Sequence, residues 1–161
     1  GDIISIDFGV ILDGFASDAA ITVPVGEVRP SVRKLISVTE EALMKGIEQA
    51  QTGNRLGAVS HAIQTHVEQA GFSVVRDFVG HGIGRNMHED PPIPNYGKAE
   101  RGPVLQAGMA LAIEPMVNMG SYSVITKMDD WTVVTIDGKP SAHFEHTIVV
   151  GDQGPEILTL L

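Results

Sequence analysis

The chain has 161 residues, of which 43% are hydrophobic and 19% are charged, and this composition is typical of one folded domain rather than of a disordered chain. The formal net charge of -9 disfavours nucleic acids and anionic membranes as partners. No apolar run approaches the roughly 18–20 residues of a membrane span. The lack of cysteine excludes a disulfide framework and a thiolate zinc site, and it favours a reducing cytoplasm as the location.

The first predicted elements are two strands joined by a tight turn. A β-rich apolar segment covers residues 3–11, and a second strand runs from about Phe15 to Val25. Between them, Asp13-Gly14 is a strong signal for a two-residue hairpin turn. The sequence therefore predicts an antiparallel hairpin at the start of the chain.

This hairpin predicts where its two acidic residues meet. With Asp13-Gly14 at the centre of the turn, Asp7 lies opposite Ala20 and Asp18 lies opposite Gly9. The two aspartates are then diagonal neighbours on one face, about 7–8 Å apart at the backbone. An ordinary acid beside a turn is the alternative interpretation of either one.

Two helices and a series of short strands are predicted next. Apolar residues at helical spacing predict one helix from Pro30-Ser31 to a stop at Gly53, and a second from Asn54, as N-cap, to Gly71. The expected strands are 73–79, 109–117, 122–127, 131–136, 142–150 and 156–160, with a loop over residues 90–108. We expect residues 1–161 to form a single domain of the α+β class, with an antiparallel-dominated sheet backed by helices.

Three acids lie in segments that should be buried. Asp7, Glu114 and Glu145 each have apolar or β-branched neighbours in an expected strand. A buried ionised carboxylate is costly unless it is paired or bound to a metal ion. A structural salt bridge is the alternative, but only 11 lysines and arginines are present and none flanks these strands closely.

Two histidines near the middle of the chain suggest different roles. Gly80 and Gly82 surround His81 and would let the main chain pass close to a metal ion or ligand. His88 lies in the following loop and is better placed to donate a hydrogen bond to a substrate carbonyl or oxyanion. We therefore expect His81 to be a metal ligand and His88 a substrate contact, whereas the neighbouring Glu89 takes no part.

The other histidines are interpreted as structural. His61 and His66 lie on the second predicted helix. His143 and His146 flank Glu145, and strand alternation is taken to point both of them away from it, so that they would support the site from outside the ligand set.

Four carboxylates and one or two imidazoles form the expected ligand set. Such a set suits a pair of hard divalent ions better than a single zinc ion. Two adjacent metal ions typically activate a bridging water for hydrolysis. The predicted chemistry is therefore metal-dependent hydrolysis.

The segments that carry these residues resemble the type I methionine aminopeptidases, which share the pita-bread fold with prolidase and aminopeptidase P. The matching segments are Ser5-Ile6-Asp7-Phe8, Ala16-Ser17-Asp18-Ala19-Ala20, Gly80-His81-Gly82-Ile83-Gly84-Arg85-Asn86-Met87-His88-Glu89-Asp90-Pro91, Ala112-Ile113-Glu114-Pro115-Met116-Val117-Asn118 and Phe144-Glu145-His146-Thr147. Their order and spacing fit along the whole chain, and the short gaps between them favour type I over type II. Met116, Arg85 and His146-Thr147 favour a methionine aminopeptidase over a prolidase or an aminopeptidase P.

The resemblance implies a cytoplasmic metalloaminopeptidase that removes the N-terminal methionine from peptides and nascent proteins. It implies that two divalent ions of manganese, iron or cobalt, with zinc also compatible, are held by Asp7, Asp18, His81, Glu114 and Glu145. Glu114 would also be the general base, and His88 would contact the scissile peptide. Met87 and Trp131 would line the pocket for the methionine side chain.

The chain departs from the family in one large respect. Members of the family carry roughly 90 further residues before the position of Gly1, including a histidine that helps to bind the substrate. We therefore expect a pita-bread domain with an incomplete N-terminal half, an exposed sheet edge and its missing N-terminal segment as a partner. A catalytically impaired fragment, a pita-bread module that only binds peptides, and a prolidase-like or aminopeptidase P-like peptidase are the alternatives.

Overall fold

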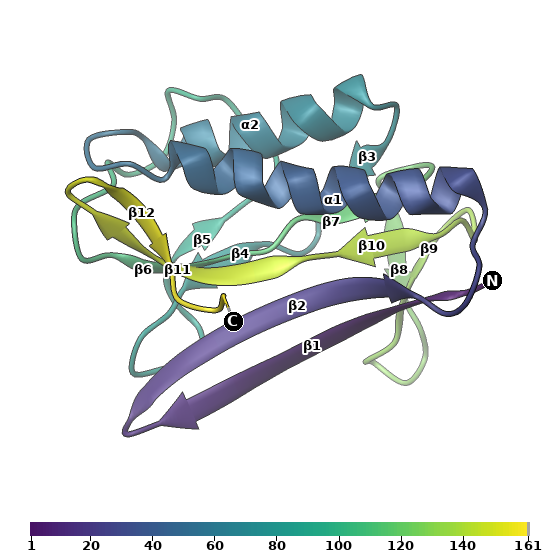
Figure 1. Ribbon diagram of the computed structural model, residues 1–161, viewed down its shortest axis with the longest axis horizontal. Coiled ribbons are helices and arrows are strands. Elements are labelled where there is room, and N and C mark those ends of the chain that lie inside the picture. The colour runs from purple at the N-terminus through teal and green to yellow at the C-terminus, as the bar shows by residue number, and fades with distance from the viewer. Residues whose placement is uncertain (161) are drawn as a thin grey trace.

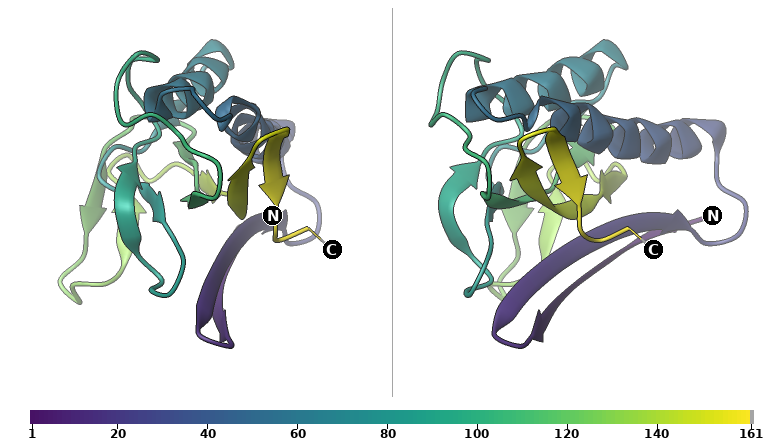
Figure 2. Two further views of the ribbon diagram at one scale, coloured as in Figure 1. Left: turned by 90° about the vertical axis from the view of Figure 1, so that its left-hand side faces the viewer. Right: turned by 60° about the vertical axis from the view of Figure 1, so that its left-hand side comes forward.

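The computed structural model describes residues 1–160 and consists of a curled antiparallel sheet with two helices on one face. Helices α1 (Pro30–Gln49) and α2 (Leu56–Gln69) lie side by side above the sheet (Figure 1). Two further views show the sheet curling away beneath them (Figure 2). The predicted α+β class with helices backing the sheet is confirmed. No helix in the described part of the chain is both long enough and apolar enough to cross a membrane.

The strands form one large sheet and two small ones. The large sheet has the order β1-β2-β11-β6-β4-β5, and β12 pairs with β11. The small sheets are β10-β7-β3 and the hairpin β8-β9, and every pairing is antiparallel. The strands are β1 (Ile3–Leu12), β2 (Phe15–Pro24), β3 (Ser73–Val74), β4 (Gly80–Gly82), β5 (Glu89–Ile93), β6 (Ala110–Ile113), β7 (Met116–Asn118), β8 (Val124–Thr126), β9 (Val133–Thr135), β10 (Ser141–His143), β11 (Glu145–Gly151) and β12 (Gly154–Ile157).

The register of the first hairpin is the one predicted. Asp7 is paired with Ala20 and Gly9 with Asp18 along β1 and β2. The turn residue Asp13 has a φ of 50°, a conformation that a two-residue hairpin turn of this kind requires and that aspartate tolerates.

The helix boundaries differ slightly from those predicted. The residue at the N-cap of α2 is Arg55 rather than Asn54, and no side chain caps this end. The side-chain amide of Asn54 instead donates to the main-chain carbonyl of Gln49 at 2.9 Å, and this hydrogen bond closes the turn between the two helices. Asparagine is favoured in both roles, so the sequence alone did not distinguish them.

Two of the long strands predicted are each divided into two. Residues 109–117 form β6 and β7, which belong to different sheets and are separated at Pro115, whose carbonyl accepts from the N–H of Phe144. Proline has no N–H for a ladder, so the pairing changes there. Residues 142–150 divide at Phe144 into β10 and β11 in the same way.

Other strands are misplaced in the prediction. The expected strand 73–79 is only the two-residue β3, and the expected strand 156–160 is instead β12, at Gly154–Ile157. Strand β5 (Glu89–Ile93) includes Pro91 and Pro92 and overlaps the start of the loop expected over residues 90–108. Proline is tolerated at a sheet edge, and β5 is the edge strand of the large sheet.

Strand alternation divides the large sheet into a core face and an open face. Leu111 and Ile113 of β6, like Ile148 of β11, are fully buried in the cluster that includes the apolar residues of α1 and α2. Successive side chains in a strand point to opposite faces, so the acids Glu114 and Glu145 are directed away from the helices. The core therefore fixes strands whose other face is free to carry a functional site.

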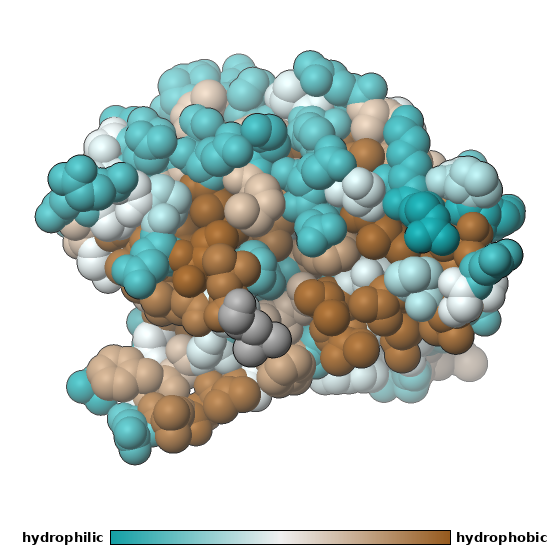
Figure 3. Space-filling view, in the orientation of Figure 1, coloured by the Kyte–Doolittle hydropathy of each residue, from teal (hydrophilic) through white to brown (hydrophobic). Residues whose placement is uncertain are grey.

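The outer strand β1 pairs only with β2 among the described residues, and it carries exposed apolar side chains. Phe8 is 62% exposed and Leu12 71% exposed, and apolar surface is prominent on the lower part of the molecule (Figure 3). The expected exposed sheet edge and apolar surface are thus present.

Substitution of Gly80 tests whether β4 must lie as close to β6 as the structure shows. A methyl group at this position would collide with the carbonyl oxygen of Ala112 in β6. We expect Gly80→Ala to lower the free energy of unfolding by about 1–3 kcal/mol, as overpacking does, measured by urea titration. The control is Gly84→Ala, where the added methyl group meets only the side-chain carboxylate of Glu89, at 3.1 Å or more. Equal losses for the two variants would contradict this interpretation.

Candidate metal centre

Cross-strand pairing assembles the candidate site on the open face of the sheet. Asp7 in β1 and Glu145 in β11 are both paired with Ala20 of β2, which lies between them. Residues paired across neighbouring strands lie on the same face. The two acids are therefore brought together although 138 positions separate them in the sequence.

A second set of cross-strand neighbours, running from β2 to β4, places Asp18 close to His81. The hydroxyl of Thr147 in β11 accepts from the N–H of Asp18 at 2.9 Å and donates to its carbonyl at 2.8 Å. Thr147 is paired with Ala112 of β6, and Ala112 with His81 of β4. One threonine thus fixes the main chain of Asp18 in line with the imidazole of His81.

The side chains converge in two groups that share Glu145. The first group is Asp7, His143 and Glu145, and the second is Asp18, His81 and Glu145. Within each group, one candidate ligand atom from every residue lies within 4.8 Å of the others. This spacing fits a cation held between the side chains of each group.

Glu114 spans the two groups. Its Oε1 lies 3.5 Å from Nε2 of His81, and its Oε2 lies 3.6 Å from Nε2 of His143. The amide of Asn95 donates to its main-chain carbonyl at 3.0 Å and fixes the residue at the end of β6. The structure therefore brings together all five residues predicted as ligands.

The electrostatics of the site favour a bound cation. Glu145 is only 2% exposed, and burial, followed by the charges of Glu114, Asp18 and Asp7, raises its pKa to about 9. Burial and the charge of Asp7 also raise the pKa of Asp18. Among residues 1–160, no lysine or arginine forms an ion pair with these carboxylates.

Two buried polar atoms at the site lack a hydrogen-bond partner. They are Oε1 of Glu145 and Nε2 of His143. Buried polar atoms in folded proteins are normally satisfied, so each such exception calls for an explanation. Divalent cations accept both carboxylate oxygen and imidazole nitrogen as ligands, and the residues present therefore fit a metal centre.

His81 is oriented by its own strand. Its Nδ1 donates to the carbonyl of Gly82 at 2.9 Å, which leaves Nε2 directed toward Glu114 with a free lone pair. The glycines on either side of it allow the main chains of neighbouring strands to approach closely. An added Cβ at Gly80 would meet the Ala112 carbonyl, and at Gly82 the Asp90 carbonyl.

The predicted substrate contacts border the ligand set on different sides. The ring of His88 is exposed, and its centroid lies 4.3 Å from that of His81. Met87 packs against Gly9, next to Asp18. Trp131, in the turn between β8 and β9, is 86% exposed and borders a cleft of about 710 Å³ whose wall includes Asp7, Glu114, Met116 and His143.

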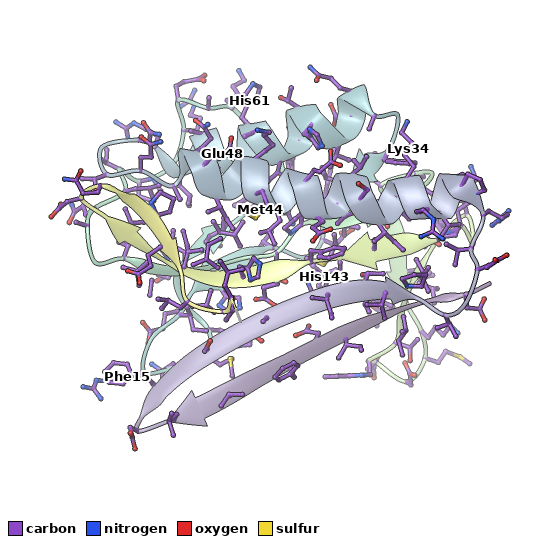
Figure 4. All side chains as sticks on the ribbon, viewed as in Figure 1. Phe15, Lys34, Met44, Glu48, His61 and His143 are labelled. Carbon is purple, nitrogen blue, oxygen red and sulfur yellow. The ribbon has the colours of Figure 1, made fainter. Side chains whose placement is uncertain are left out.

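The prediction that His143 points away from Glu145 is wrong. Residues two positions apart in an extended chain share a face, and only the adjacent residue His146 is turned to the other side. His143 is the last residue of β10 and lies next to the β1–β2 hairpin (Figure 4), with Nδ1 4.0 Å from Oδ2 of Asp7. The spacing relative to Glu145 was the signal that could have identified it.

Glu89 and three further histidines make contacts outside the two ligand groups. The carboxylate of Glu89 accepts from the N–H of Asn86 at 2.8 Å and closes the loop after β4. The other contacts are between His146 Nδ1 and Thr159 Oγ1, His61 Nδ1 and the Gly97 carbonyl, and His66 Nε2 and Glu41 Oε2.

Comparison with known proteins identifies the class. The sequence profile of metallopeptidase family M24 matches residues 1–152, and the chain therefore belongs to this family. Methionine aminopeptidase from Clostridium perfringens is 63% identical over 100% of this chain and 65% of its own length. Methionine aminopeptidase 1 from Bacillus subtilis is 58% identical over 99% of this chain and 64% of its own length.

Solved structures agree with the family. The crystal structure of methionine aminopeptidase from Thermotoga maritima superposes with a TM-score of 0.98 at 53% identity, covering 100% of this chain and 65% of that one. Prolidase from Pyrococcus furiosus, at 24% identity and a TM-score of 0.79, shares the fold over 42% of its length. The pita-bread fold is thus confirmed, and the chain spans about two thirds of the length of its methionine aminopeptidase relatives.

The raised pKa of Glu145 predicts a pH dependence for the metal-free protein. The folded protein keeps a proton on Glu145 up to about pH 9, whereas the unfolded chain releases it near 4.5. Raising the pH through this window therefore favours the unfolded chain, by up to about 1.4 kcal/mol per pH unit for one proton. We expect the free energy of unfolding, measured with urea and a chelator, to fall from pH 5 to pH 9.

The variant Glu145→Gln should reduce this slope, and the raised pKa of Asp18 should leave a smaller slope of the same sign. Glu100→Gln removes an acid from an exposed loop and serves as the matched control. An unchanged slope in Glu145→Gln would contradict the assignment.

Proposed function

We propose that this chain is the metal-binding part of an aminopeptidase that removes the N-terminal methionine from peptides and nascent proteins. The observation that carries the proposal is the pair of ligand groups that share Glu145 and are spanned by Glu114. The identity to proteins named methionine aminopeptidase gives the substrate class.

The proposed cofactor is a pair of divalent ions of manganese, iron or cobalt, with zinc also compatible. Asp7, Asp18, His81, Glu114 and Glu145 are the ligands that we propose, in line with their convergence. When bound, such ions lower the pKa of water and polarise the scissile carbonyl, which supplies a nucleophile at neutral pH.

Glu114 is proposed to move the proton. Its two carboxylate oxygens face the two imidazoles, His81 and His143, at 3.5 and 3.6 Å, and it also borders the cleft. A carboxylate in this position can accept the proton of the attacking water and deliver it to the leaving amine. The negative charges of Asp7 and Glu114 in the same cleft favour a substrate with a free, protonated α-amino group.

His88 is proposed to stabilise the oxyanion. It is exposed beside His81 and can donate to a substrate oxygen at the site without competing for the proposed ligand positions. Met87 and Trp131 are proposed to contact the methionine side chain from two sides. The proposed location is the cytoplasm.

Substitution of Glu114 and of His88 should separate proton transfer from stabilisation of the oxyanion. We expect Glu114→Gln to abolish turnover of a methionyl-alanyl peptide, and His88→Asn to lower kcat by about 100- to 1000-fold while metal binding is retained. His61→Asn, on the exposed face of α2, is the control. Because the chain spans about two thirds of its relatives, the assay is run on the chain alone and on a chimera with the N-terminal residues of the Clostridium perfringens relative.

Full activity of Glu114→Gln would contradict the proposed mechanism. Metal binding without cleavage of methionyl peptides by either protein would favour the module that only binds peptides. Cleavage restricted to X-prolyl peptides would favour a prolidase-like or aminopeptidase P-like enzyme.

Trp131 offers a direct test of the side-chain pocket. It is the sole tryptophan, so the intrinsic fluorescence of the protein reports this residue alone. We expect methionine to shift the emission to shorter wavelength as it covers the indole, and N-acetylmethionine, which has no free amine, to have little effect. Trp131→Ala should weaken methionine binding by about 30-fold, or about 2 kcal/mol, measured by calorimetry. Unchanged affinity would exclude Trp131 from the pocket.

A further inference from the structure

His143 is held at the site by its main chain. Its N–H donates to the hydroxyl of Thr22 in β2 at 2.8 Å, and the same hydroxyl donates to its carbonyl at 2.7 Å. The ring is 15% exposed and is directed toward the acids of the open face. Strands β10 and β2 therefore fix the main chain of His143 at the site.

The distances around this ring fit shared ligation of an ion better than hydrogen bonding. Nδ1 is 4.0 Å from Oδ2 of Asp7, and Nε2 is 3.6 Å from Oε2 of Glu114. Both separations exceed the usual hydrogen-bond range of about 2.7–3.2 Å. Two donors that each lie about 2.0–2.2 Å from one ion are about 3–4.3 Å apart, which agrees with the separation between Nε2 of His143 and Oε2 of Glu114.

Two buried polar atoms without a hydrogen-bond partner give a second, independent argument. Nε2 of His143 and Oε1 of Glu145 are both buried without a hydrogen-bond partner among residues 1–160. A histidine that served only to position a carboxylate would be expected to donate to it. A cation between the two side chains would satisfy both of them.

We infer that His143 is an additional metal ligand, supplying an imidazole to the group that contains Asp7 and Glu145. The inference rests on the proposed metal centre and extends its ligand set from five residues to six. Each group then has one imidazole, His81 in one and His143 in the other. Because imidazole suits iron, cobalt and zinc better than manganese, His143 biases the Asp7 side of the site toward those metals.

Proton NMR of the Co²⁺-loaded chain tests the inference. A histidine that binds Co²⁺ through one nitrogen shows the exchangeable N–H of the other nitrogen far outside the ordinary spectral range. We expect two such signals from the wild-type chain, one from His81 and one from His143, and one signal from His143→Gln. The control His146→Gln, which loses only the contact with Thr159, should keep both signals.

Metal titration gives a second readout. His143→Gln should weaken Co²⁺ binding by about 10- to 100-fold or more at one of two sites, with a smaller effect on Mn²⁺. If His143→Gln keeps both shifted signals, His143 is not a ligand and the inference fails. If the wild-type chain binds no Co²⁺ at all, the proposed metal centre itself fails, and the two failures are thus distinguishable.

Isotope labelling of the wild-type protein tests the inference without a variant that must fold. In wild-type protein with ¹⁵N-labelled histidine, Zn²⁺ should shift ring nitrogens of two of the six histidines to values typical of metal-bound imidazole. A shift confined to a single histidine would overturn the inference even if His143→Gln did not fold.

Discussion

Mutual repulsion among four carboxylates on one face of a sheet is the constraint on which this structure depends. Asp7, Asp18 and Glu145 come from three strands and Glu114 directly follows a fourth, and the described residues offer them histidines but no lysine or arginine within ion-pair distance. Without compensation such an arrangement would spread apart or take up protons. The rest of the fold acts to hold these side chains together.

Three features supply that restraint. The hairpin register fixes the two aspartates relative to each other. The hydroxyl of Thr147 binds both main-chain groups of Asp18, and the hydroxyl of Thr22 does the same for His143. On the opposite face, the apolar residues of α1 and α2 pack against the same strands. The candidate ligand atoms are therefore preorganised by neutral hydrogen bonds and by packing, and neither of these adds charge to the site.

Much of this arrangement could be predicted from the sequence, because its determinants are local. The Asp13-Gly14 turn fixes the hairpin register, and the acids embedded in apolar segments lie at the candidate site. Of the three acids expected to be buried, however, only Glu145 is, because Asp7 lies on the outer strand β1 and its side chain is 52% exposed. Strand interruptions could not be predicted, since they depend on which sheet each segment joins. Phe144, for example, separates two strands by donating to a carbonyl elsewhere in the chain. His143 could have been placed from its spacing to Glu145, but its contact with Asp7 depends on a pairing between distant strands.

The two faces of strand β11 connect the hydrophobic core to the candidate site. Ile148 and Val150 lie in the hydrophobic core, and Glu145 and Thr147 face the site within the same few residues. Filling of the site and folding are therefore linked equilibria, since a ligand that binds only the folded chain stabilises it by mass action. A chelator would then act on this protein as a mild denaturant. In a cell, the supply of such a ligand would then affect the lifetime of the protein against proteolysis.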